Sequence, residues 1–236
     1  MTPAPALVIF DLDGTLIDTA PDLVASLNHT IAALDLPPVG YSDLTHLVGH
    51  GAKAMIERAC KLRGYSLEPQ SLEPLLERFV AFYTETMPGD SRPYPGLVEA
   101  MDALKADGFK LAVCTNKLES LALPLIRHLG LMHYFDAITG GDSFPVRKPD
   151  ARHLVGTVER AGGELQRSVM VGDSINDILV ARNAGIPSIA VPFGYSDVPV
   201  ATLGPDAMIA HFDELRPALI ENLLAGGQTT RSQSIA

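Results

Sequence analysis

The hydrophobic residues of this chain gather in short continuous runs rather than alternating with polar residues. The clearest runs are 7–10, 111–114, 168–171 and 188–191, with weaker ones at 137–139 and 207–209. Such runs are typical of strands covered on both faces. Helical patterns that stop at glycines lie over 97–106, 118–129, 151–161 and 175–184. This alternation predicts an α/β fold with a doubly wound, Rossmann-like parallel sheet as its core.

Residues from about 20 to about 87 break this rhythm, because helical stripes follow one another there with no strand between them. One stripe contains Leu23, Leu27, Ile31 and Leu34, and a second covers 72–83. The simplest explanation is an inserted all-helical cap domain over 19–88. The α/β catalytic core then comprises 1–18 and 89–225. The tail 226–236 is rich in Gly, Thr, Ser and Gln and is predicted to be disordered.

Composition narrows the class of protein. The chain holds 47% hydrophobic and 19% charged residues, with a formal net charge of −10. No uninterrupted apolar run is long enough to cross a bilayer, and the clustered Lys and Arg that nucleic acid binding requires are missing. Cys60 and Cys114 suggest no disulfide framework and the first residues suggest no export signal, so we expect a cytoplasmic protein.

Polar residues that follow the predicted strands are the candidates for chemistry, because ligands bind beyond the carboxyl ends of strands in an open parallel sheet. Asp11 and Asp13 are two apart on an extended stretch, so both carboxylates point the same way, and Gly14 then allows a sharp turn. Alone, this Asp-Gly would be an ordinary turn. The other strand ends, which carry further polar groups, favour a functional site.

Asp173 and Asp177 follow the run 168–171 and lie on one face of the helix expected after it. Carboxylates at adjacent strand ends form an oxygen-rich site that suits Mg²⁺. A phosphoryl group bound there also needs a cation and hydrogen-bond donors on its other side. Lys148, Thr115 and Asn116 can provide them.

The order of these groups resembles the haloacid dehalogenase superfamily of phosphotransferases. The first motif, Asp-x-Asp-Gly-Thr, is complete at 11–15, and the last, Gly-Asp-Ser-x-x-Asp, is complete at 172–177. The resemblance implies that Asp11 attacks phosphorus and becomes an aspartyl-phosphate. It implies that Asp13 protonates the leaving alcohol and later activates water.

The same resemblance implies a magnesium enzyme. Asp11, the backbone carbonyl of Asp13 and the side chain of Asp173 would hold Mg²⁺, with Asp177 in support. Three further residues would bind the phosphoryl oxygens: Thr115, Asn116 and Lys148.

A helical cap inserted after the first motif resembles the branch that hydrolyses small, soluble phosphomonoesters. Within it, the runs 12–22, 48–52 and 115–117 are similar to those of the phosphoglycolate phosphatases. This implies a monomer or homodimer that acts on a small phosphorylated metabolite, with 2-phosphoglycolate as the expected substrate. The substrate carboxylate is expected to meet cap residues, for which the candidates are Gly49, His50, Lys53 and Arg58.

Several alternatives remain open at this point. A phosphatase for a sugar phosphate or pyrophosphate shares most of these motifs, and a phosphomutase differs mainly in its cap. A phosphonate-cleaving relative would lack the second acid, Asp13. From other classes, a phospho-accepting receiver domain would need neither a cap nor Asp13, and a silent binding protein on the same fold would not need every polar position filled.

Overall fold

The computed structural model describes residues 4–40, 43 and 51–232. A six-stranded sheet with the order β5-β4-β1-β6-β7-β8 forms its centre, and all its strand pairs are parallel. The strands are β1 Leu7–Phe10, β4 Lys110–Cys114, β5 Ala137–Thr139, β6 Ser168–Gly172, β7 Ser188–Ala190 and β8 Ala207–Met208. Each of the six apolar runs of the sequence is therefore a strand, and the predicted parallel sheet is confirmed.

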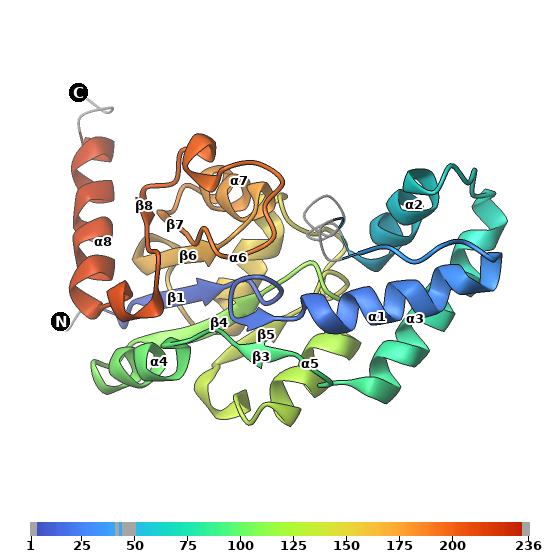
Figure 1. The fold of residues 1–236 in the computed structure, drawn as a ribbon. Helices are drawn as coiled ribbons and strands as arrows, with labels where there is room; N and C mark the ends of the chain where they lie inside the picture. Colours follow the sequence, from blue (N-terminus) through green and yellow to red (C-terminus); the bar gives the residue numbers. More distant parts are fainter. Residues whose placement is uncertain (1–3, 41–42, 44–50, 233–236) are drawn as a thin grey trace.

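Helices cover both faces of this sheet (Figure 1). The buried side chains of α6 Ala151–Arg160 and α7 Ile175–Ala184 pack on one face, against Leu7, Ile9 and Met170. On the other face, Val8, Phe10 and neighbouring strand residues pack against three more helices: α4 Leu97–Ala106, α5 Glu119–His128 and α8 Pro217–Ser232. Because both faces are covered, the strands are continuously apolar.

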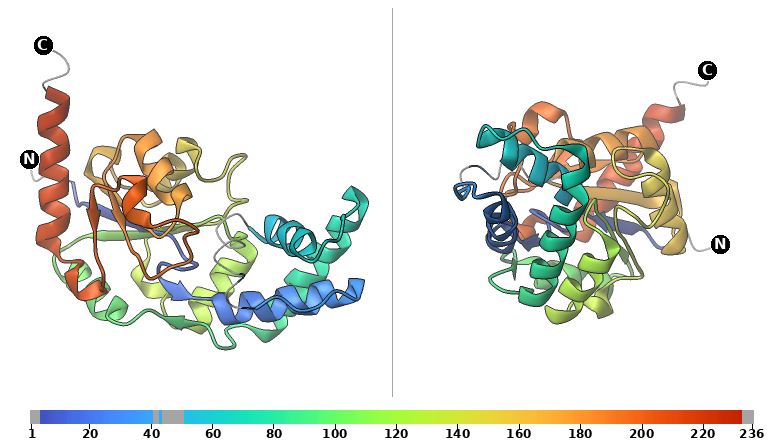
Figure 2. Two further views of the ribbon diagram at one scale, coloured as in Figure 1. Left: turned by 45° about the horizontal axis from the view of Figure 1, so that its top comes forward. Right: turned by 90° about the vertical axis from the view of Figure 1, so that its right-hand side faces the viewer.

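Three helices outside these layers form the cap at one end of the molecule, opposite α8 (Figures 1 and 2). They are α1 Ala20–Ile31, α2 Ala52–Leu62 and α3 Leu72–Thr86. Their apolar stripes face one another and continue into the core cluster, as the sequence pattern predicts. The buried members include Leu23, Leu27, Ile31, Met55, Ile56, Leu75, Phe79 and Tyr83.

The chain enters and leaves the cap through a small second sheet. β2 Ile17–Asp18 pairs in an antiparallel manner with β3 Arg92–Pro93, so that Asp18 lies opposite Arg92. The two crossings are therefore adjacent, although 73 residues lie between Asp18 and Arg92. The exact limits of the cap domain, 19 and 88, stay a prediction.

The C-terminal helix α8 continues through Ser232, beyond the start of the predicted tail at 226. The disorder expected over 226–236 stays a prediction. A helix that has already formed adds residues without a new nucleation cost, so even polar residues can extend it. Residues 233–236 lie outside the described part. In that part, no helix is long and apolar enough to span a membrane.

Candidate active site

The predicted polar groups meet at the carboxyl ends of three neighbouring strands. Asp11 follows β1, Thr115 follows β4 and Asp173 follows β6, and β1 lies between the other two in the sheet. The edge where they meet faces the cap (Figure 1). Strand order alone thus brings Asp11 together with two residues that are more than 100 positions away in the sequence.

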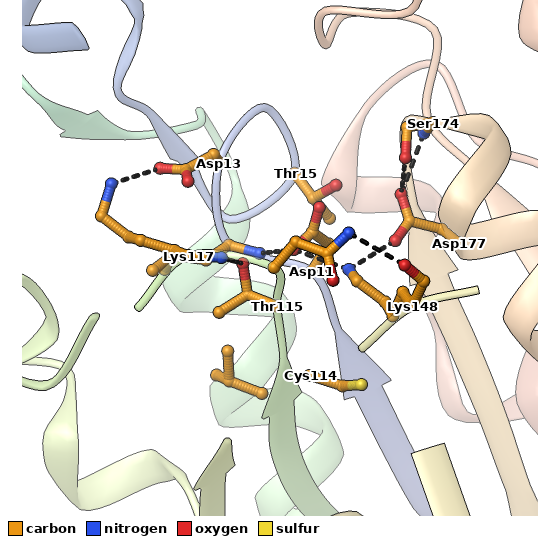
Figure 3. A network of polar contacts seen from close by, with 12 residues as sticks. Asp11, Asp13, Thr15, Cys114, Thr115, Lys117, Lys148, Ser174 and Asp177 are labelled. Carbon is orange, nitrogen blue, oxygen red and sulfur yellow. Dashed lines mark hydrogen bonds and ion pairs between the residues drawn. The ribbon is translucent and has the colours of Figure 1, made fainter. Parts of the chain in front are cut away.

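Asp11 is buried, and the described residues hold it through one of its two carboxylate oxygens. Its Oδ1 accepts a hydrogen bond of 2.7 Å from the N–H of Leu12 and lies 2.9 Å from Lys148 Nζ (Figure 3). No described residue donates a hydrogen bond to Oδ2. Burial, opposed by Lys148 and reinforced by Asp177, raises the pKa of Asp11 to about 6. The carboxylate is oriented, with Oδ2 left available to a ligand.

Asp13 is held in the same way. Its Oδ1 accepts a hydrogen bond of 2.7 Å from the hydroxyl of Thr19 and lies 3.0 Å from Lys117 Nζ. Within the described residues, Oδ2 again accepts no hydrogen bond. Thr19 is the residue before α1, and Lys117 comes from the loop after β4, so contacts from two elements fix this side chain.

Lys148 is buried between two carboxylates. Its Nζ lies 2.6 Å from Asp177 Oδ1 as well as 2.9 Å from Asp11 Oδ1. Asp177 Oδ2 accepts hydrogen bonds from both the N–H and the hydroxyl of Ser174, which closes the first turn of α7. Burial disfavours the Lys148 ammonium, but the two carboxylates outweigh that effect and raise its pKa. Lys148 is therefore a fixed, charged group.

The backbone of Lys148 is held by a histidine that sequence reasoning missed. His153 is fully buried, and its Nδ1 accepts the N–H of Lys148 at 3.2 Å, while its Nε2 lies 3.0 Å from the carbonyl of Gly140. Only the neutral ring with its proton on Nε2 satisfies both contacts. Burial, together with the charge of Lys148, lowers the pKa of His153 to about 4. This ring therefore stays neutral at neutral pH.

Asp173 sits where neighbouring backbone comes unusually close. Its Oδ1 accepts from the Thr15 hydroxyl at 2.9 Å and its Oδ2 from the N–H of Tyr195 at 2.7 Å. A Cβ atom at Gly14 would lie 2.6 Å from Asp173 Oδ2, and one at Gly194 would lie 2.3 Å from it. Only glycine fits at these two positions without displacing the carboxylate.

The donor set fits a hard divalent cation. Carboxylate oxygens of Asp11, Asp173 and Asp177 lie within 4.8 Å of one another, and all three residues are buried. Burial and repulsion by Asp177 and Asp11 raise the pKa of Asp173 well above its ordinary value. With Asp13 these residues carry four carboxylates against the two ammonium groups of Lys148 and Lys117. A divalent cation would balance the remaining negative charge.

The phosphate-binding candidates of the second strand end lie beside Asp11 in the pocket. Thr115 is buried, and its Oγ1 accepts the N–H of Lys117 at 3.2 Å, which leaves the hydroxyl hydrogen able to donate. Asn116 donates through Nδ2 to the carbonyl of Lys148 at 3.2 Å. The predicted core residues are thus brought together in one site.

Of the four predicted cap residues, the two that the structure describes, Lys53 and Arg58, do not join them. A pocket opens above Asp11 and Asp13, and in the described part of the chain neither Lys53 nor Arg58 lines it. Lys53 is exposed and pairs with Glu73 at 3.0 Å, so the expectation that it meets the substrate is not supported by its position. The apolar spacing along α2 predicts its buried face, but it could not reveal how that helix lies relative to the pocket. Gly49 and His50 lie outside the described residues.

Lys117 lines this pocket instead, and sequence reasoning did not single it out. Its Nζ lies 4.3 Å above the ring of Tyr83 in the cap, besides its contact with Asp13. Burial opposes its charge, but Asp13 more than compensates, so the pKa of Lys117 is raised. Its position directly after Thr115-Asn116 was a signal that could have identified it.

Comparisons with known proteins agree with this geometry. A family model described as haloacid dehalogenase-like hydrolase matches residues 8–191. A phosphoglycolate phosphatase from Agrobacterium fabrum is 62% identical over 225 residues, which cover 95% of this chain and 97% of the relative. A phosphoglycolate phosphatase from Mesorhizobium japonicum is 50% identical, with coverage of 92% and 96%.

A solved structure shares the whole fold. The crystal structure of a predicted phosphoglycolate phosphatase from Haemophilus somnus superposes with a TM-score of 0.84 at 32% identity, and the match covers 91% of this chain and 98% of that one. Sequence and structure thus lead to the same family. The chain belongs to the haloacid dehalogenase-like hydrolases and is a phosphatase of that family.

Proposed function

We propose that this protein is a cytoplasmic, magnesium-dependent phosphatase that hydrolyses 2-phosphoglycolate to glycolate and phosphate through an aspartyl-phosphate on Asp11. One observation carries the chemical part of the proposal. Asp11 and Asp13 are each anchored through Oδ1, and each has an Oδ2 that accepts no hydrogen bond from a described residue. Two oriented carboxylates beside one pocket can divide nucleophilic and proton-transfer work between them.

In the first step, Asp11 Oδ2 forms a bond to phosphorus while the bond from phosphorus to the glycolate oxygen breaks. Asp13 begins this step protonated and gives its proton to the departing oxygen. Glycolate therefore leaves with a neutral hydroxyl group. In the second step, Asp13 takes a proton from water, which attacks the phosphorus of the aspartyl-phosphate. Asp11 then leaves as a carboxylate, and Asp13 is again protonated.

The phosphoryl group needs cationic and hydrogen-bonding partners throughout. Lys148 provides a fixed positive charge 2.9 Å from Asp11 Oδ1, and Thr115 and Asn116 provide donors from the neighbouring strand end. Asp177 holds Lys148 and is itself fixed at the start of α7, which suits a supporting role. These residues orient the phosphoryl group in line with Asp11.

Asp11, Asp173 and the backbone carbonyl of Asp13 would hold Mg²⁺. Both oxygens of Asp177 already accept contacts, from Lys148 and from Ser174, which argues for Asp11 and Asp173 as the direct carboxylate ligands. When bound, the metal neutralises negative charge on the transferring phosphoryl group.

The choice of substrate is supported by the relatives from Agrobacterium fabrum and Mesorhizobium japonicum, which are named phosphoglycolate phosphatases. Apolar residues that include Leu23, Met55 and Phe79 line the cap side of the pocket. A short substrate suits such a pocket better than a sugar phosphate, whose several hydroxyls would need hydrogen-bond partners there.

The test is steady-state phosphate release from 2-phosphoglycolate, with a panel of sugar phosphates and pyrophosphate for comparison. Activity should require Mg²⁺ and disappear in Asp11→Asn, and kcat should fall about 10²- to 10⁴-fold in Asp13→Asn. Similar kcat/KM values for phosphoglycolate and sugar phosphates would remove the substrate assignment but leave the phosphatase. Isomerisation of a sugar phosphate without phosphate release would show a mutase instead.

A further inference from the structure

Lys117 places a positive charge at the junction of core and cap. It belongs to the loop after β4, and only 4% of its side chain is exposed. Its Nζ contacts Asp13 Oδ1 at 3.0 Å on the core side and lies over the Tyr83 ring of α3 on the cap side. Figure 3 shows the ammonium at the far end of the polar network from Lys148. The two lysines therefore lie at opposite ends of this network.

The surroundings of this ammonium are mostly apolar. Asp11, Asp13 and Lys117 are the charged side chains that line the pocket within the described ranges, and Lys117 is the cation among them. The remaining wall toward the cap is formed by Leu23, Ala52, Met55, Phe79, Leu118 and Leu121. A second anionic group of a substrate would find its positive partner at Lys117.

The ammonium group of Lys117 also has a hydrogen-bond donor available for a ligand. It carries three N–H donors, of which one meets Asp13 and another is directed toward the face of Tyr83. Among the described residues, these two contacts of the ammonium leave its third donor for a ligand. A carboxylate that accepts it gains a charge-assisted hydrogen bond in a place largely shielded from water.

The distance between the ester oxygen and the carboxylate of phosphoglycolate matches the spacing of Asp13 and Lys117. Asp13 must lie beside the ester oxygen in order to protonate it, and Lys117 Nζ is 3.0 Å from Asp13. In phosphoglycolate, one methylene separates the ester oxygen from the carboxylate. A substrate with its ester oxygen at Asp13 and its phosphoryl group at Asp11 therefore brings its carboxylate next to Lys117.

We propose that Lys117 is a specificity-determining residue that binds the carboxylate of the substrate, in addition to holding Asp13. This inference rests on the proposed function and refines it, since it replaces a cap cation by a core lysine. Selection then works through the distance between two anions: Lys148 marks the phosphoryl end and Lys117 the carboxylate end.

The test compares 2-phosphoglycolate with ethyl phosphate, which has the same two-carbon skeleton without the carboxylate. The wild-type enzyme should prefer phosphoglycolate by about 100-fold in kcat/KM. This factor corresponds to the free energy of roughly one buried charge-assisted hydrogen bond. Lys117→Met should lower that ratio to near one, mainly through a higher KM for phosphoglycolate. Loss of the Asp13 contact should slow both substrates alike and therefore leave the ratio unaffected.

A second pair of variants keeps the test decisive if Lys117→Met does not fold. Lys117→Arg retains the charge and should keep part of the preference, whereas Lys117→Gln should lose it. Lys53→Ala is the matched control, because Lys53 is a cap lysine paired with Glu73 on the surface and should leave the ratio unchanged.

The outcomes separate the two proposals. If variants without charge at position 117 keep the wild-type ratio and only lose rate, Lys117 positions Asp13 and does not bind the carboxylate. If the wild-type enzyme itself does not prefer phosphoglycolate to ethyl phosphate, the proposed substrate is wrong, whatever Lys117 does.

Discussion

The hydroxyl of Thr19 donates a hydrogen bond of 2.7 Å to Asp13 Oδ1. Thr19 is fully buried and immediately precedes α1, yet its hydroxyl does not cap that helix. Its hydrogen bond therefore serves Asp13 rather than the helix. Together with Lys117, it anchors Asp13 through Oδ1 and leaves Oδ2 for the proton transfer that we propose.

Replacement of Thr19 should reduce turnover with little effect on substrate binding. Thr19→Val keeps the shape of the side chain but removes the hydroxyl, so Asp13 loses one of its two anchors. A hydrogen bond to a charged group is worth about 1.5–3 kcal/mol, which corresponds to a fall in kcat of about 10- to 100-fold. Thr19→Ser should restore most of the rate. An unchanged kcat in Thr19→Val would show that Lys117 alone orients Asp13.

A methyl group at position 194 should disturb metal binding without unfolding the protein. A Cβ there would lie 2.3 Å from both Cβ and Oδ2 of Asp173, so Gly194→Ala must displace the carboxylate. We expect a higher Mg²⁺ concentration for half-maximal activity, by about 10-fold or more, as when a metal ligand is misplaced. Gly226→Ala in α8 is the control, because nothing lies within 4 Å of its added Cβ. Equal Mg²⁺ dependence in both variants would refute this role of Gly194.

Magnesium should stabilise the protein more at neutral than at acidic pH. The pKa of Asp11 rises from 3.8 to about 6 on folding without metal, so the folded state keeps a proton that the unfolded state releases. The stability of the metal-free protein therefore falls as pH rises through this interval. A bound divalent cation removes that cost.

Thermal unfolding with Mg²⁺ or with EDTA tests this expectation. A ligand at about 100 times its Kd adds about 2.7 kcal/mol, which is about 5–10 °C in Tm for a chain of this size. The increase in Tm should be larger at about pH 7.5 than at about pH 5. It should vanish in Asp173→Asn, and its persistence there would place the metal elsewhere.

His153 should make the fold sensitive to acid in the opposite sense. Its pKa falls from 6.5 to about 4 on folding, so the unfolded chain takes up a proton that the buried ring refuses. Its contribution to stability is complete above 6.5 and is lost as pH falls toward 4.

The variant His153→Gln isolates this effect, because an amide can accept from the N–H of Lys148 and donate to Gly140 without titrating. We expect the free energy of unfolding, measured in urea, to decrease less on acidification in His153→Gln than in the wild type. The contribution of Asp11 is common to both proteins and cancels in the comparison. Identical pH profiles would contradict the buried neutral state of His153.

The sequence was sufficient to predict the α/β core, because the patterns that mark its strands and helices are local. Strands such as β1 and β6 are continuous apolar runs, and the polar residues at their ends converge once the strand order is known. α4 and α7 have the predicted bounds because glycines end both helical patterns. The sequence alone could therefore predict that Asp11 and Asp173 are neighbours.

The contacts between cap and core could not be predicted in this way. Whether Lys53 or Lys117 faces the pocket depends on how α2 and α3 lie against the loop after β4, and no local pattern encodes that orientation. The same holds for His153, whose partners Lys148 and Gly140 are set by the packing of α6 on the sheet. Residues whose role comes from tertiary packing have no local signature.

The pairing of β2 with β3 has a consequence for how this family can diversify. The chain departs from the core and rejoins it at two points that lie one strand spacing apart, with Asp18 opposite Arg92. An insert of another length or another architecture can start and end on the same pair of strands, since the entropy of loop closure grows only slowly with length. Evolution or a protein engineer can thus graft a new lid onto this stem, and so change what is recognised, while the chemistry beneath it is inherited intact.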